Sequence, residues 1–207
     1  MDPSRPTLIA GIDEAGRGCL AGPVYAGAVI LGKVRIRGLD DSKKLLPERR
    51  EELFEKIQRR ALAWAVGIAT VEEVDRINIL RASLLAMARA VAALHTAPEE
   101  AWVDGNQPPT LPCRIRMVIG GDGLHPCIMA ASIVAKVARD REMRRLDSEF
   151  PGYGFAQHKG YATPEHRQAL RVLGPSTMHR MSFAPCAQAD LFGGDDAEFF
   201  DPGFVAV

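Results

Sequence analysis

The chain lacks any long apolar run, and no stretch approaches the roughly 20 residues that are needed to cross a bilayer. Its N-terminus, MDPSRPTLIAG, has no apolar stretch behind a basic start, so we expect no secretory signal. The four cysteines form no CxxC pair and the five histidines show no HExxH spacing, which argues against a disulfide framework or a zinc site. These absences predict a cytoplasmic protein with reduced thiols and no membrane partner.

What the chain does have is enough apolar sequence for a core. Of its 207 residues, 47% are hydrophobic, which is typical of one globular domain, and we see no internal repeat. The net charge of zero hides an asymmetry, because residues 187–207 hold five acids and no Lys or Arg. The preceding residues keep all 26 basic side chains against 21 of the 26 acidic ones, an excess compatible with a polyanionic partner. We expect a domain over residues 1–186 and a mobile acidic tail over 187–207.

Strand-like and helical patterns alternate along the domain. We expect strands within residues 7–15, 22–31, 63–71, 99–109 and 113–122, and helices within 46–62, 78–95, 128–150 and 163–174. Asn78 is suited to the N-cap of the second helix, and Thr163-Pro164 is suited to the start of the last. The pattern predicts an α/β fold with a mixed sheet flanked by helices.

Carboxylates follow three of the expected strands. Asp13 and Glu14 come after LIAGI, Asp104 after AWV, and Asp122 after RMVIGG. If these strand ends lie side by side, the carboxylates converge, and such a cluster is costly without cations. Oxygen ligands suit Mg²⁺ or Mn²⁺, and two such ions about 3.5–4 Å apart cleave phosphodiesters.

Two points stay open for these acids. Asp before Gly, as at residues 104–105 and 122–123, is also a common turn pair, so ordinary turns are an alternative. Neighbouring strand residues point to opposite faces, so Asp13 and Glu14 cannot both face one metal unless the strand bends, or unless Glu14 reaches round its end or offers its backbone carbonyl.

The segment GIDEAGRG, residues 11–18, also resembles half of a phosphate-binding P-loop. The residues after Gly16 are Arg-Gly rather than Lys-Ser/Thr, and two acids stand where phosphates would be cradled. The sequence therefore excludes an NTPase of that type.

Seven segments together resemble ribonuclease HII, in the order of that family and across residues 8–185: GIDEAGRG.LAGPV, LDDSKKL, VDGN, GGD, AASIVAKVARDREM, HKGYATPEH and GPSTMHRMSFAP. The resemblance implies a ribonuclease H-like fold with a five-stranded mixed sheet and a C-terminal helical extension. It implies a monomeric endonuclease that cuts RNA paired to DNA, and cuts 5′ of a single ribonucleotide in duplex DNA, leaving a 3′-hydroxyl and a 5′-phosphate. The family's four catalytic acids fall on Asp13, Glu14, Asp104 and Asp122, with Mg²⁺ or Mn²⁺ as the cofactor.

The resemblance also implies roles in substrate recognition. The backbone of Gly16-Arg17-Gly18 would read the ribose 2′-hydroxyl, which separates RNA from DNA. The ring of Tyr161 would stack at the RNA–DNA junction, although taken alone this residue reads as half-buried packing. The remaining expected phosphate contacts are Ser42, Lys43 and Lys44, although exposed lysines taken alone are usually just solvated. His179 and Arg180 read as scaffold, and Cys19 stands where the family usually has proline.

Other functions are weaker. A hybrid-binding protein with a decayed site would not be expected to keep all four acids. Another nuclease of this fold, such as a junction resolvase or ribonuclease HIII, is the third alternative. Ribonuclease HIII usually adds an N-terminal domain, for which the residues before the first motif leave no room.

A short motif lies at the start of the tail. QADLF, residues 188–192, resembles the peptide by which many bacterial repair proteins bind the sliding clamp, with Gln188, Leu191 and Phe192 at its specified positions. The alternatives are chance, or Leu191 and Phe192 folding back onto the domain.

Overall fold

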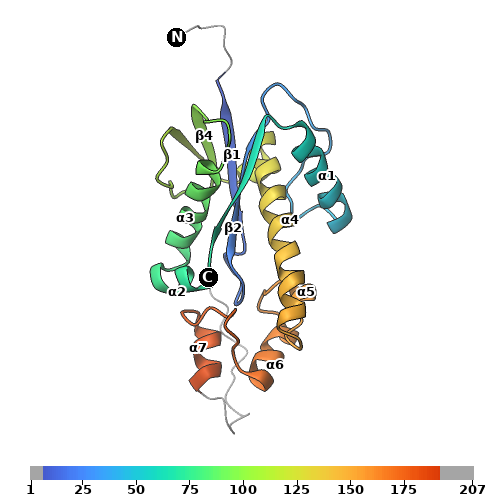
Figure 1. Cartoon of the computed structure of the whole chain (residues 1–207), viewed down its shortest axis with the longest axis vertical. Helices are drawn as coiled ribbons and strands as arrows, with labels where there is room; N and C mark the ends of the chain where they lie inside the picture. The colour runs from blue at the N-terminus through green and yellow to red at the C-terminus, as the bar shows by residue number, and fades with distance from the viewer. Residues whose placement is uncertain (1–6, 192–207) are drawn as a thin grey trace.

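Five strands form one mixed sheet in the order β3-β2-β1-β4-β5 (Figure 1). In this computed structural model the fold is described for residues 7–191, and side chains for 7–188. β1 pairs antiparallel with β2 and parallel with β4, while β2–β3 is antiparallel and β4–β5 parallel. The five-stranded mixed sheet is therefore confirmed. The strands are β1 Ile9–Ala15, β2 Val24–Ile30, β3 Ala63–Ala69, β4 Glu100–Asp104 and β5 Arg114–Val118.

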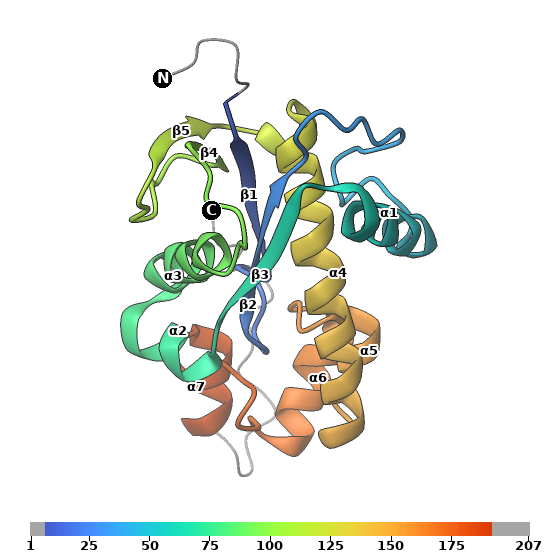
Figure 2. The ribbon, with the colours of Figure 1, turned by 45° about the horizontal axis from the view of Figure 1, so that its top comes forward.

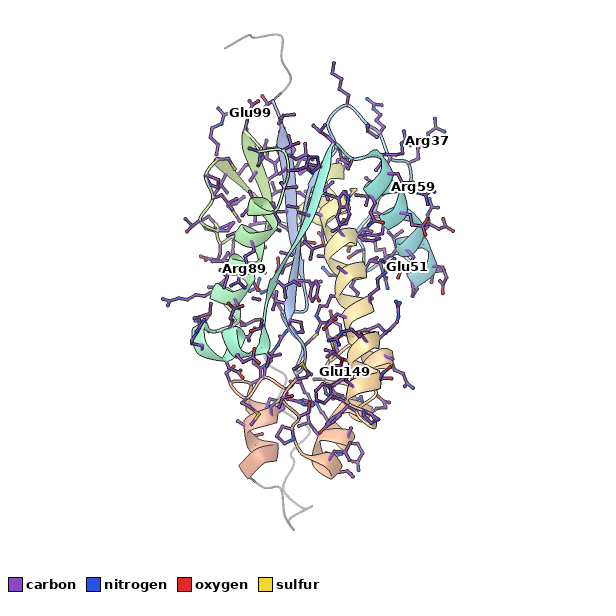
Figure 3. The ribbon with its side chains drawn as sticks, in the orientation of Figure 1. Arg37, Glu51, Arg59, Arg89, Glu99 and Glu149 are labelled. Carbon is purple, nitrogen blue, oxygen red and sulfur yellow. The ribbon has the colours of Figure 1, made fainter. Side chains whose placement is uncertain are left out.

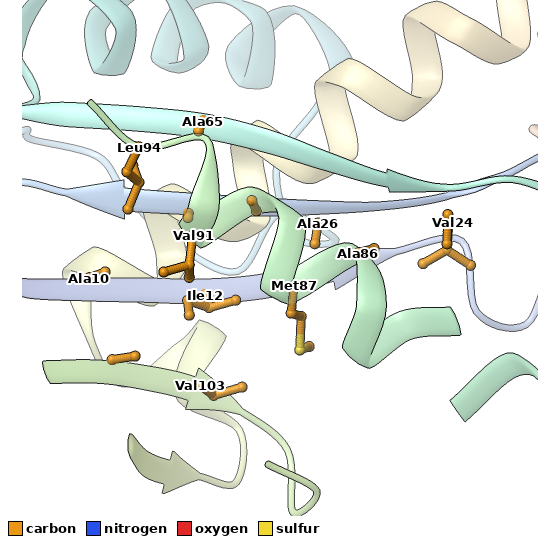
Figure 4. Close-up of a cluster of buried hydrophobic side chains, with 14 of the residues drawn as sticks. Ala10, Ile12, Val24, Ala26, Ala65, Ala86, Met87, Val91, Leu94 and Val103 are labelled. Atoms are coloured by element: carbon orange, nitrogen blue, oxygen red, sulfur yellow. The ribbon is translucent and has the colours of Figure 1, made fainter. Parts of the chain in front are cut away.

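Helices cover both faces of the sheet. α1 (Pro47–Arg60) and α4 (Pro126–Glu149) lie on one side and α3 (Ile79–Ala92) on the other, as Figure 2 shows. On the α3 side, alanines and aliphatic residues of the central strands pack against Met87 and Val91 (Figure 4).

α4 lies unusually close to the two central strands. A Cβ at Gly11 would stand 2.1 Å from the backbone of Cys127, and one at Gly27 would stand 2.3 Å from the carbonyl oxygen of Ala131. The two glycines thus let the helix backbone rest directly on β1 and β2, which brings α4 side chains next to the end of β1.

The C-terminal helices gather at one end of the sheet, where Figure 1 shows α5 (Phe155–His158), α6 (Pro164–Leu173) and α7 (Ala184–Leu191). α6 begins after Thr163, whose Oγ1 accepts a hydrogen bond from the His166 N–H. The expected C-terminal helical extension is present. No helix in residues 7–191 is long and apolar enough to cross a membrane.

Two elements differ from the expectation. Residues 71–77 form a helix, α2 (Val71–Ile77), that begins with a capping box between Thr70 and Glu73, whereas we expected the preceding strand to run to residue 71. α7 includes residues 187–191, which we assigned to the tail, and residues 192–207 lie outside the described range. The boundary at residue 186 stays a prediction. Asn78 is confirmed as the N-cap of α3, because its Oδ1 accepts from the Arg81 N–H at 3.1 Å.

Candidate active site and recognition loop

Three of the four expected acids converge. One carboxylate oxygen from each of Asp13, Asp104 and Asp122 lies within 4.8 Å of the others. The parallel pairing of β1 with β4 sets Asp13 beside Asp104, and Asp122 follows β5 in a 3₁₀ turn, η1 (Gly121–Gly123). The Gly121 N–H donates to Asp104 Oδ1 at 2.7 Å, which ties this turn to the end of β4. Asp122 thereby comes into the cluster although it lies beyond its strand.

The cluster is electrostatically strained. Burial, and then the charges of Glu14 and Asp104, raise the pKa of Asp13 well above its usual range. Burial and then Asp122 raise the pKa of Asp104. The cation paired with the cluster is Lys43, whose Nζ lies 3.2 Å from Asp122 Oδ2. Burial alone would lower the pKa of Lys43, but Asp122 outweighs it and the pKa is raised.

The donor set fits a divalent cation. Three converging carboxylates, two of them with raised pKa values, offer hard oxygen ligands that gain most from added positive charge. Among the described residues, no histidine or cysteine joins the group, so its chemistry favours Mg²⁺ or Mn²⁺ over zinc.

Glu14 does not join the other three acids. It follows Asp13 in an extended strand, so its side chain leaves on the other side, and its Oε1 pairs with Arg17 Nη1 at 3.2 Å. Burial raises the pKa of Glu14, Arg17 lowers it, and Asp104 raises it further. The charge of Asp104 therefore still affects the pKa of Glu14. The strand, however, does not bend enough to bring the carboxylates of Asp13 and Glu14 into one site.

The LDDSKKL segment contains a buried serine, Ser42, as well as two exposed lysines, Lys43 and Lys44. Ser42 is 3% exposed, and its Oγ lies 2.8 Å from Ser132 Oγ on α4, where Ser132 in turn hydrogen-bonds Asp13. Ser42 is thus placed to support Asp13 rather than to meet a phosphate at the surface. Lys43 faces Asp122, and exposed Lys44 lies 3.8 Å from Asp40. The substrate roles of these three residues stay predictions.

The two glycines of Gly16-Arg17-Gly18 differ. Gly16 has φ +97°, and a Cβ there would stand 2.0 Å from Arg139 Nε. Gly18 has no such φ, and a Cβ there would meet no atom within 4 Å. Gly16 is therefore required by the loop's own packing, whereas Gly18 is open on its outer side, where a ligand can approach.

Two fully buried arginines hold residues 16–23, which we call the recognition loop after the role that the resemblance implies. Arg139 donates to the carbonyl oxygens of Pro23, Ala21 and Lys159 at 2.8–3.1 Å. Arg180 donates to those of Gly22 and Arg17 at 2.7–3.0 Å. Neither makes an ion pair within residues 7–188. Sequence reasoning placed Arg180 only as scaffold, because nothing local shows what a distant arginine binds.

Tyr161 borders the same loop. It is 42% exposed, forms a β-bridge with Cys19, and has Lys136 Nζ 5.5 Å from its ring centroid. Burial, and then Cys19, raise the pKa of Tyr161. Cys19, in the family's usual proline position, is fully buried in this bridge. The Tyr161 side chain is thus partly exposed beside the loop, and Lys136 forms an ion pair with Asp140 at 2.8 Å.

A family model for ribonuclease HII matches residues 10–186. The chain belongs to the ribonuclease HII family. It is 59% identical over 181 residues to the ribonuclease HII of Bordetella pertussis, across 87% of this chain and 90% of that one. It is therefore an endoribonuclease of the ribonuclease H class, as the resemblance implied.

Two solved structures share its fold. The ribonuclease H2 of Pyrococcus horikoshii superposes with a TM-score of 0.75 at 26% identity, covering 88% of this chain and 97% of that one. The RNase HII of Archaeoglobus fulgidus, solved in a complex with PCNA, gives 0.71 at 32% identity, covering 84% and 92%. These matches confirm the ribonuclease H-like fold.

A buried pair of histidines, His166 and His179, supports the backbone of Tyr161. The Ser176 N–H donates to His179 Nδ1, so the proton of His179 lies on Nε2. That proton faces His166 Nε2 at 3.0 Å, which leaves the His166 Nδ1–H to donate to the Tyr161 carbonyl at 2.9 Å. When both rings are neutral, this placement of their two protons satisfies every one of these contacts. A third proton on the pair would make two N–H groups face each other. The sequence showed no signal for this pair, since its members lie 13 residues apart.

We expect these histidines to resist protonation. Burial lowers the pKa of each to about 4; after burial, His158 lowers that of His166, and His166 lowers that of His179. Because both folded pKa values lie below the unfolded value, the pair's contribution to stability is present above pH about 6.5 and is lost as pH falls toward 4. An NMR titration should show both imidazoles neutral at pH 5.5. Protonation midpoints near 6.5 would contradict the hydrogen-bond assignment.

Proposed function

We propose that this chain hydrolyses the RNA strand of RNA–DNA hybrids and cuts duplex DNA 5′ of a single embedded ribonucleotide, leaving a 3′-hydroxyl and a 5′-phosphate. The observation that carries the proposal is the convergence of Asp13, Asp104 and Asp122 at the strand that leads directly into the recognition loop. Cutting and the choice of the cut position would then be joined within residues 13–18.

The acid cluster would hold the catalytic metal. Asp13, Asp104 and Asp122 would be the direct ligands of Mg²⁺ or Mn²⁺, and Glu14 would act from the other side of the strand end. Two such ions, when bound, supply an activated water and charge stabilisation for the leaving oxygen. Lys43, whose Nζ lies 3.2 Å from Asp122 Oδ2, would contact a phosphate that enters beside this carboxylate.

The recognition loop would read the sugar. The open side of Gly18 lets the backbone approach a ribose 2′-hydroxyl, and Arg17, about half exposed, can exchange Glu14 for a phosphate. The half-exposed ring of Tyr161 would stack on the deoxyribose beyond the junction. The neutral histidine pair would keep the Tyr161 backbone in place for that contact.

A gel assay on duplex DNA with one ribonucleotide tests the proposal, with Mg²⁺, Mn²⁺ or chelator. We expect metal-dependent cleavage at the 5′ side of the ribonucleotide, and none in chelator. Binding without cleavage in either metal would instead support a non-catalytic hybrid-binding protein. A duplex of the same sequence without the ribonucleotide is the control.

We propose further that the tail binds the bacterial sliding clamp through Gln188, Leu191 and Phe192. Gln188 is exposed on α7; the side chain of Leu191 and the whole of Phe192 lie outside the described residues. The solved complex of a family member with PCNA supports clamp binding for this family.

Peptide binding tests the tail. A peptide of residues 184–207 should bind the clamp, and Leu191→Ala with Phe192→Ala should weaken it about tenfold or more, because apolar anchors dominate such interfaces. Equal binding of the two peptides would remove the proposal.

A further inference from the structure

A basic cleft lies between α1 and the loop that follows β2. It has a volume of about 580 Å³ and is lined by Arg35, Ile36, Arg37, Lys56 and Arg60. Ile36 is buried against the apolar side of α1, which fixes the loop, while Arg35 and Arg37 on either side of it are exposed. Lys56 and Arg60 are one helical turn apart and so share a face of α1. Four cations thus converge on one hollow.

Three of the four glutamates of α1 pair with arginines that do not line the cleft. The pairs are Glu51–Arg141, Glu52–Arg49 and Glu55–Arg59, at 2.6–2.7 Å. Figure 3 shows Arg37, Glu51 and Arg59 on this side of the molecule. Within residues 7–188, none of the four cleft cations forms an ion pair, so the like charges repel until an anion enters.

The cleft lies within reach of a duplex held at the acid cluster. α1 is on the same side of the sheet as α4, whose Ser132 contacts Asp13. Arg37 and Lys43 are six residues apart, so their Cα atoms are separated by at most about 21 Å. That span equals about six base pairs at 3.4 Å each.

We propose that this basic cleft is a second contact for the phosphate backbone of the duplex, beyond the residues that read the cut position. The inference rests on the proposed function for its substrate class. The cleft would add affinity without sequence or sugar preference, because its cations face phosphates rather than bases. The cleft lies at most about six base pairs from Lys43, so a duplex that extends this far past the active site on one side would reach it.

Charge removal tests the cleft. The full chain carrying R37Q/K56Q/R60Q, all at exposed positions, is compared with R76Q/R81Q/R171Q, which removes the same charge from exposed positions on α2, α3 and α6. Fluorescence anisotropy measures binding to an all-DNA duplex of 30 base pairs across a salt series. All-DNA duplexes keep this test independent of whether the chain cleaves at ribonucleotides.

For the cleft variant we expect about tenfold weaker binding to this duplex and a salt slope smaller by about two to three. The control variant should bind it within twofold of the native chain. Extending a ribonucleotide substrate separately on its 5′ and 3′ sides should show the KM effect of the cleft variant on one side, with kcat unchanged. No loss of binding by the cleft variant, or an equal loss by the control variant, would overturn the proposal.

Discussion

Asp13→Asn is expected to lower the cleavage rate about a thousandfold or more while leaving the fold intact. One carboxylate oxygen of Asp13 lies within 4.8 Å of those of Asp104 and Asp122, and Ser132 hydrogen-bonds Asp13. Its amide replacement keeps the shape but removes the negative charge that a divalent cation needs. Single-turnover cleavage of a one-ribonucleotide duplex measures the effect, with Asp147→Asn on α4 as the matched control.

The same substitution should stabilise the metal-free protein. Burial, and then Glu14 and Asp104, raise the folded pKa of Asp13 above its unfolded value, so the charged form is destabilising above that unfolded value. The neutral amide of the variant has no such cost, and its advantage should shrink as pH falls through the raised pKa and vanish below the unfolded one. Added Mg²⁺ or Mn²⁺ should raise the Tm of the native chain more than that of the variant. Near-native cleavage by the variant would disprove the metal assignment.

Gly16→Ala and Gly18→Ala should separate the two demands on the recognition loop. At Gly16 a methyl group would meet Arg139 at φ +97°, so we expect a stability loss of about 1–3 kcal/mol and at least tenfold slower cleavage at an embedded ribonucleotide. At Gly18 a methyl group meets nothing, so stability should change by less than about 0.5 kcal/mol. The KM of Gly18→Ala for a duplex with an embedded ribonucleotide should nevertheless rise, because the methyl group would occupy the side from which we propose that the ribose approaches.

Thermal unfolding together with kcat and KM for both variants checks this prediction. Gly18→Ala with native KM would show that the backbone at this position does not approach the substrate. A stable and fully active Gly16→Ala would show that Arg139 does not depend on the glycine.

Much of the fold was predictable because its signals are local. The apolar runs gave all five strands, and Asn78 and Thr163 gave two helix starts. The start of α2 could also have been predicted, since Thr70 and Glu73 have the spacing of a capping box. The acids were predictable as strand-end residues, but the separation of Glu14 from the cluster depended on whether β1 bends, which composition does not encode.

The supports of the site were not predictable for a different reason. Ser42 and Ser132 are 90 residues apart, and Arg139 and Arg180 bind carbonyl oxygens of the loop from more than 100 residues away. A carbonyl oxygen is present at every position, so no side-chain pattern in the loop marks it as the partner of an arginine. Only the three-dimensional arrangement shows why Ser42 is buried and why Gly16 must be glycine.

The buried arginines fasten the proposed recognition loop from parts of the chain other than the loop itself. The acids and their serine supports lie within residues 13–132, whereas the loop is held by Arg139 and Arg180. The shape of the loop therefore depends on α4, which supplies Arg139, and on the C-terminal segment, which supplies Arg180.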